Sequence, residues 1–298
     1  MDQQYAPFAM YSCATMAFVS LGLFAALVIE IARNEVPKER MSILRSVATP
    51  FNICLELMAF SLILIFASES AVLIILNDKS QQNQLIIRQA FRSWGIALFK
   101  LTYLHYSYVR TYPIIEQEFP RAVWPVWVFM GASTVVTVIP TLCRTLRIWI
   151  PLEILLTIKN HASVSTYVSL SLMDFIFLVT FIKHLQFTKT EGESLDKHFA
   201  IISKFGIVAV ILFSSLTVWD IIFVNTNSEV YLILVEFHFV VIFVILGSMK
   251  IALRILKNSK AQEQQRIRDL FTKELSARRT ILMSQDTVVI DDKEVDPA

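Results

Sequence analysis

Apolar residues in this chain are gathered into long runs that are separated by short polar segments. A helix needs about 20 apolar residues to cross the hydrocarbon core of a bilayer. Seven runs reach that length and predict transmembrane helices at about residues 6–32, 49–76, 86–110, 122–143, 162–183, 205–225 and 230–254. The expected fold is therefore all-α: a polytopic membrane protein built as a bundle of seven transmembrane helices.

A shorter apolar stretch lies between the fourth and fifth predicted spans, at residues 145–158. It is too short to cross a bilayer and is interrupted by Arg147, Pro151 and Glu153. We expect a loop helix at the membrane interface here. An eighth span is the less favoured alternative.

The composition agrees with a membrane protein. Hydrophobic residues make up 55% of the 298 residues and charged residues only 17%, and the mean hydropathy is +0.57. A soluble domain of this length would carry more charge. The net charge of +2 gives no reason to expect nucleic acid as a partner. The expected partner of the chain is the lipid bilayer.

Basic residues flank the predicted spans unevenly, which predicts their orientation. Cytosolic loops of membrane proteins carry an excess of lysine and arginine. That excess places the N-terminus outside and the C-terminus in the cytosol. The basic residues on the predicted cytosolic side are Arg33, Lys38, Arg40, Arg45, Arg110, Arg121, Lys183, Lys189, Lys197, Lys204, Lys250, Arg254, Lys257 and Lys260, against Lys79, Arg144, Arg147 and Lys159 on the other side.

The chain after the seventh span has a different character. We therefore divide the whole chain into a transmembrane domain at residues 1–257 and a cytosolic tail at residues 258–298. In the tail, Ile267, Leu270, Phe271, Leu275 and Leu282 recur near one helical face and predict an amphipathic helix. From residue 286 the tail is acidic, and we expect it to be disordered. We expect a solvated cytosolic tail with this amphipathic helix on the membrane surface; a partner-binding helix is the alternative.

Charged residues inside the predicted spans are the main functional signal. Such residues are costly in lipid and usually face the bundle interior. On the third span one sector of the helix holds Arg88, Arg92, Lys100, Tyr103, Ser107 and Arg110. Counting the rise per residue places Glu69, Asp220 and Glu236 near the depth of Arg92, and Asp174 near that of Lys100.

Two hypotheses explain these charged residues. They form buried ion pairs, such as Lys100 with Asp174 and Arg92 with Glu69 or Glu236, or they line an outward-opening ligand pocket. Both hold if a ligand competes for a paired charge, which would couple binding to helix movement. The candidate ligand-binding residues are Arg88, Arg92, Glu69, Lys100, Asp174, Asp220, Glu236 and His238.

The sequence offers little for reaction chemistry. None of the five histidines has a second histidine four residues away, the pair that helical zinc hydrolases use. Lys250 is near the cytosolic end of the last span, whereas a retinal Schiff base needs a lysine at mid-membrane. We therefore predict a protein that is not an enzyme and has no metal site and no cofactor.

Seven spans, an outside N-terminus, basic inner loops and a basic stretch after the seventh span resemble the heptahelical G-protein-coupled receptors. Rhodopsin-like motifs are mostly absent: Tyr108-Val109-Arg110-Thr111 keeps only the arginine of the acid–arginine–aromatic motif at the inner end of the third span. The resemblance implies a divergent receptor in the plasma membrane. It would bind an extracellular ligand in the outer half of the bundle and signal to a G protein or another cytosolic partner.

The resemblance gives Arg110 a role in cytosolic coupling. The positive-inside pattern alone also explains an arginine at that position, so a purely topological role is the alternative. Two other functions stay open for the whole chain. A transporter or channel would use Lys100, Asp174, Asp220 and Glu236 as a pathway, and a membrane scaffold would use its charges only for assembly.

Overall fold

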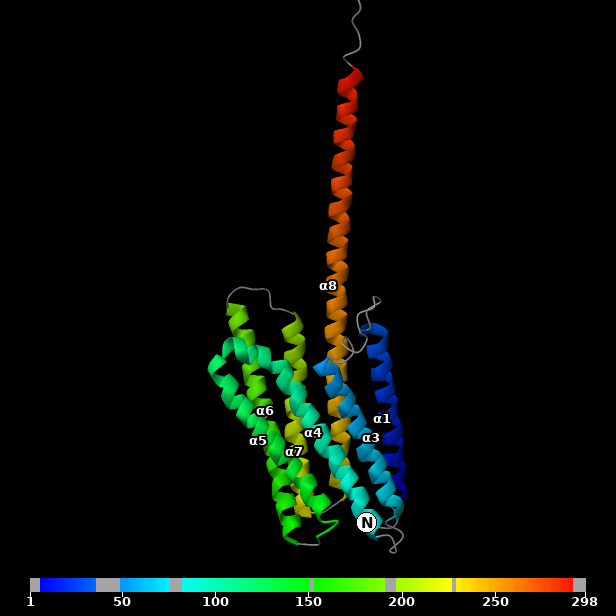
Figure 1. The fold of residues 1–298 in the computed structure, drawn as a ribbon, viewed down its shortest axis with the longest axis vertical. Coiled ribbons are helices and arrows are strands. Elements are labelled where there is room, and N and C mark those ends of the chain that lie inside the picture. The colour runs from blue at the N-terminus through cyan, green and yellow to red at the C-terminus, as the bar shows by residue number, and fades with distance from the viewer. Residues whose placement is uncertain are drawn as a thin grey trace, which may run out of the picture. The chain divides into compact units, whose positions relative to one another are not determined.

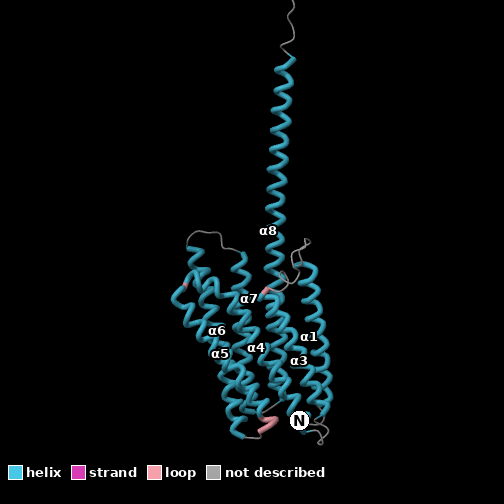
Figure 2. Tube along the Cα trace, in the orientation of Figure 1, coloured by secondary structure: helices cyan, strands magenta, loops and turns pink. Residues whose placement is uncertain are grey.

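The computed structural model describes residues 6–35, 49–75, 82–150, 153–190, 197–226 and 229–291, and within these ranges it is helical with no strand (Figures 1 and 2). The short 3₁₀ helix η2 spans Pro120–Ala122. The α-helices are α1 (Ala6–Glu35), α3 (Pro50–Ile75), α4 (Gln82–Glu118), α5 (Val123–Leu146), α6 (Glu153–Thr190), α7 (Lys197–Thr226) and α8 (Glu229–Asp291).

The seven predicted spans correspond one to one with these seven α-helices. Among the described residues, six helices contain a stretch long and apolar enough to cross a membrane, namely α1, α3, α5, α6, α7 and α8. The remaining helix, α4, is not among them, because its many polar residues lower its hydropathy. A chain with six helices of this kind is an all-helical integral membrane protein. Exposing so much apolar surface to water would be unfavourable, whereas a bilayer core accommodates it.

The predicted interfacial loop helix at residues 145–158 is wrong. Helix α5 continues to Leu146, a turn follows it, and the residues from Glu153 onward already belong to α6. The apolar residues after Pro151 run directly into those of the next predicted span, and the two stretches form one continuous helix. As a result α6 begins nine residues earlier than the predicted span.

Helix α4 is the centre of the bundle within residues 1–249, the larger of two compact units. It packs against α3, α5 and α6, and its aromatic residues Phe99, Tyr103 and Tyr106 are almost completely buried. Successive helices run in opposite directions (Figure 1). The starts of α1, α4, α6 and α8 therefore lie at one end of the bundle, together with the ends of α5 and α7. We call this the N-terminal end.

Residues 250–298 form the second compact unit, which we describe by itself. Its described part is the continuation of α8 to Asp291, and residues 292–298 lie outside the described residues. Apolar side chains predicted for an amphipathic helix are exposed here, namely Ile267, Leu270, Phe271 and Leu275. Its cytosolic location and the disorder of its acidic end stay predictions.

A glycine allows α3 and α4 to pack closely. A Cβ atom at Gly95 would lie 2.9 Å from Cγ1 of Ile65 and 3.2 Å from the Ile65 backbone nitrogen. We expect Gly95→Ala to lower the free energy of unfolding by about 1–2 kcal/mol, because α3 must shift to admit the methyl group. The apparent melting temperature of the detergent-purified protein measures this loss.

Gly131→Ala on α5 is the matched control. A Cβ atom at Gly131 would meet nothing within 4 Å, and alanine has the higher helix propensity. We expect this variant to melt at or slightly above the temperature of the original protein. If the two variants melt at the same temperature, close packing at Gly95 does not limit stability.

Candidate functional site

A buried cluster of three charges joins α3, α4 and α8 at the N-terminal end. The Nε atom of Arg92 lies 3.0 Å from Oε2 of Glu69 and 2.6 Å from Oε1 of Glu236. All three side chains are at least nine-tenths buried. The expected ion pair of Arg92 with Glu69 or Glu236 is therefore confirmed, and Arg92 pairs with both. The depths estimated from the sequence were correct for these residues.

One nitrogen of the Arg92 guanidinium has no hydrogen-bond partner. Its Nε–H donates to Glu236, so Glu69 is held by charge attraction without a hydrogen bond of its own. The Arg92 Nη2 atom is buried and has no hydrogen-bond partner within the described part of the chain. Buried donors in proteins nearly always have partners, because an unsatisfied one is costly. Other atoms of Arg92 help to line a cavity.

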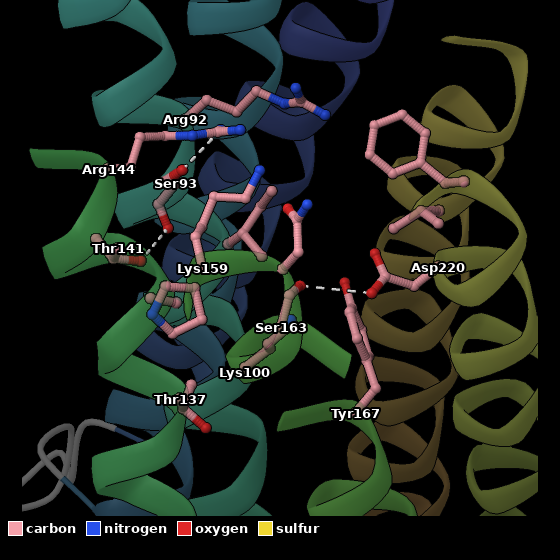
Figure 3. Close-up of a pocket in the computed structure, with 16 residues that line it drawn as sticks. Arg92, Ser93, Lys100, Thr137, Thr141, Arg144, Lys159, Ser163, Tyr167 and Asp220 are labelled. Atoms are coloured by element: carbon pink, nitrogen blue, oxygen red, sulfur yellow. Dashed lines mark hydrogen bonds between the residues drawn. The ribbon is translucent and has the colours of Figure 1, made fainter. Parts of the chain in front are cut away.

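The cavity has a volume of about 200 Å³ and lies among α4, α5, α6, α7 and α8 (Figure 3). Four basic residues line it: Arg92 and Lys100 from α4, Arg144 from α5 and Lys159 from α6. Among the described residues, Asp220 of α7 is the one acidic residue in its lining. Since the starts of α4 and α6 and the ends of α5 and α7 meet here, the cavity belongs to the N-terminal end of the bundle.

Two of the basic residues in the lining have no acidic partner. Arg144 donates to the hydroxyl of Ser93 at 2.8 Å and to the carbonyl of Gln89 at 3.4 Å, and both acceptors are neutral. Lys159 has neither a hydrogen bond nor an ion pair with any residue that the structure describes. Asp220 accepts a long hydrogen bond from Ser163, at 3.4 Å. The cavity therefore presents uncompensated positive charge.

Lys100 is stabilised by an aromatic ring. Its Nζ atom lies 3.3 Å from the centre of the Tyr167 ring, a cation–π contact. The predicted ion pair of Lys100 with Asp174 is wrong: Asp174 instead accepts a 2.6 Å hydrogen bond from the hydroxyl of Tyr103. Side chains on a helix lean toward its N-terminus. Lys100 therefore reaches away from Asp174, which lies at the level of Tyr103.

The structure brings together part of the predicted ligand-binding set. Arg92, Lys100 and Asp220 line the cavity, and Glu69 and Glu236 hold Arg92. The other three lie elsewhere: Arg88 donates to the carbonyl of Ala71 at 2.6 Å, Nδ1 of His238 is 2.7 Å from the carbonyl of Leu234, and Asp174 bonds to Tyr103. Ligand binding by any of the eight stays a prediction.

Sequence reasoning missed Arg144 and Lys159, which it counted as loop charges. Both lie inside helices. A signal was present, because Arg144 extends the polar series Thr137 and Thr141 on α5, and Lys159 precedes Ser163 and Tyr167 at intervals of four. Intervals of three and four residues mark one face of a helix.

Arg110 lies toward the opposite end of α4 and points into the bundle. Its guanidinium carbon is 5.1 Å from the centre of the Phe181 ring on α6, and Nη1 is 3.8 Å from the sulfur of Met249 on α8. A Cβ atom at Gly206 on α7 would lie 3.6 Å from its Nη2. No acid within the described ranges forms an ion pair with Arg110. The coupling role and the purely topological role of Arg110 both stay predictions.

An aromatic layer separates the cavity from Arg110. The Tyr103 ring stacks on that of Phe213 with centroids 3.9 Å apart, and the Phe99 and Phe239 rings are 4.7 Å apart. All four side chains are almost completely buried. They come from α4, α7 and α8, and the two on α4 lie between Arg92 and Arg110.

In the part of the chain that the structure describes, no group of three or more histidine, cysteine or acidic residues could hold a metal ion. No protein-family model, curated protein or solved structure matches the chain. The fold and the site thus define its class: an all-helical integral membrane protein with a small, positively charged cavity at the N-terminal end of the bundle.

Proposed function

We propose that this protein is a divergent heptahelical receptor of the plasma membrane, similar in architecture to the G-protein-coupled receptors. Helix α4 is its third span, the N-terminus is outside and the tail is cytosolic. The burial of the α4 charges supports a seventh span. Arg92 and Lys100 are only 7% and 4% exposed, so lipid does not have to solvate them, and the helix can cross the membrane with its polar sector covered.

The observation that carries this proposal is that α4 connects a cavity at one end of the bundle with Arg110 at the other. An extracellular ligand in the cavity reaches Arg92, whose two carboxylate partners belong to α3 and α8. Competition for Arg92 would change how these helices are held. Arg110, which contacts α6 and α8, would carry the rearrangement to a G protein. Such differential contacts are what a ligand needs to shift a conformational equilibrium.

Transport is the second candidate, because the polar residues of α4 extend from Arg92 to Arg110 along one sector of the helix. The aromatic layer of Phe99, Tyr103, Phe213 and Phe239 argues for the receptor instead. A pathway along α4 would have to separate these buried rings in every cycle. A receptor only needs the helices on either side of the layer to shift.

We expect the protein, expressed in cells with a panel of G proteins, to raise nucleotide exchange on at least one of them. Arg110→Ala should reduce this activity about tenfold at equal surface expression, because it removes the contacts to α6 and α8. The control is Arg121→Ala, which removes an exposed arginine of η2 at the same end of the bundle and should keep full activity.

Two outcomes would count against the receptor. One is a protein that reaches the surface and activates no G protein, either alone or with a library of small metabolites. The other is solute flux into proteoliposomes containing the purified protein, which would support the transporter.

A further inference from the structure

We propose that the cavity beside Arg92 binds a small organic monocarboxylate. The idea that this ligand is the receptor's signal rests on the proposed receptor function. The idea that the cavity binds it is argued from the cavity alone. The ligand class follows from three properties of the lining: its charge, the positions of its cations and its apolar wall.

The charge of the site favours a ligand with one negative charge. Arg92 with its two carboxylate partners carries one net negative charge, and Asp220 adds a second. Lys100, Arg144 and Lys159 contribute three positive charges, so one positive charge remains on the described residues of the site. Buried and half-buried charges without counter-charges are costly. A monoanion neutralises the site, whereas a cationic ligand would increase its excess charge.

The cations of the lining are not spread evenly around the cavity. Arg92, Arg144 and Lys159 gather on one side of the cavity, and Asp220 is on the other (Figure 3). Lys159 has no polar partner among the described residues, and Arg144 bonds only to neutral oxygens, so neither has an anionic partner to give up. A carboxylate accepts several hydrogen bonds at once, and those from charged donors are the strongest.

The rest of the lining suits a short apolar chain. Ile96, Ala97, Pro140, Phe223 and Val235 supply carbon surface to the cavity. Its volume of about 200 Å³ is below the usual range of roughly 300–1,000 Å³ for drug-sized ligands. Inorganic phosphate has no apolar part to cover this wall and carries more charge than the site requires. A carboxylate with a few carbon atoms can pair with the cations of the lining and cover its apolar wall.

The test measures binding of butyrate to the full chain purified in a neutral detergent. Calorimetry and the apparent melting temperature are recorded at constant ionic strength, with chloride as the reference anion. We expect saturable binding of butyrate and a rise in melting temperature. Butyramide has the same shape without the charge, and butylammonium has the opposite charge; neither should bind. Binding of phosphate in preference to butyrate, or equal effects of butyrate and butyramide, would overturn the proposal.

Variants then locate the site. Lys159→Met should weaken butyrate binding about tenfold, the typical effect of losing one charged hydrogen-bond donor, and Lys159→Arg should restore most of the affinity. Arg147→Met is the matched control, because Arg147 is an exposed cation at the same end of the bundle and does not line this cavity. If Lys159→Met and Arg147→Met weaken butyrate binding equally, butyrate is attracted only by the overall positive charge at the N-terminal end and not by a specific contact with Lys159.

Lys159 has no polar contact to lose, so its variants should fold; unchanged melting temperatures without ligand check this. The two proposals can fail separately. Butyrate binding without any G-protein response would contradict the receptor and leave the site intact. G-protein activation by a protein that binds no butyrate would contradict the site and leave the receptor intact.

Discussion

Arg92→Met is expected to cause the largest loss of stability in this chain, about 3–5 kcal/mol, the typical cost of leaving a buried charge without its partner. Methionine fills similar space but leaves the carboxylates of Glu69 and Glu236 buried without a counter-charge. These two acids come from α3 and α8, so their repulsion acts directly on the packing around α4. The apparent melting temperature and the monodisperse fraction in size-exclusion chromatography measure the effect.

The control for this prediction is Arg88→Met, about one turn earlier on α4. Arg88 donates to the carbonyl of Ala71 and has no ion pair within the described ranges, so its loss should cost about 1 kcal/mol. The decisive variant combines Arg92→Met with Glu69→Gln and Glu236→Gln. Neutral amides no longer repel each other, and most of the stability should return. A triple variant as unstable as Arg92→Met alone would show that packing, not charge, makes Arg92 necessary.

Tyr103→Phe is expected to have the second-largest effect, a loss of about 2–3 kcal/mol. The Tyr103 hydroxyl is the hydrogen-bond donor to Asp174, and both side chains are almost completely buried. Removing it leaves a polar carboxyl group in the bundle interior without that donor. Tyr106→Phe is the control, since Tyr106 is equally buried on the same helix and packs through its ring on Phe51. Thermal unfolding of both variants tests the difference.

A double variant separates the hydrogen bond from the ring. Replacing both partners of a buried hydrogen bond costs much less than replacing one. Tyr103→Phe with Asp174→Leu should therefore be more stable than Tyr103→Phe alone, and the double-mutant cycle should give a coupling of about 1–3 kcal/mol. Additive effects would mean that the 2.6 Å contact contributes nothing to the association of α4 with α6.

These variants also distinguish the roles along α4. Arg92 joins α4 to two other helices by charge, Lys100 rests on an aromatic ring, and Tyr103 bonds to α6. Arg110 contacts an aromatic ring and a methionine. Loss of surface expression in every variant would favour the scaffold reading. Stable variants with altered signalling would favour the receptor.

The sequence by itself determined the helices and the depth of their charges. A run of about 20 apolar residues has few alternatives to a membrane-spanning helix, and each predicted run corresponds to a helix. A rise of 1.5 Å per residue converts position in a span into depth. That arithmetic correctly placed Glu69 and Glu236 beside Arg92. Orientation and function stay predictions.

Only the tertiary structure decided which groups at a given depth face each other. Depth depends on sequence position alone, but facing depends on how each helix is rotated and packed and on which rotamer a long side chain adopts. Lys100 therefore meets the ring of Tyr167, not Asp174. Arg144 and Lys159 become part of the cavity because α5 and α6 extend beyond their predicted ends. The cavity itself forms where five helices meet, and this packing cannot be predicted from any single stretch of sequence.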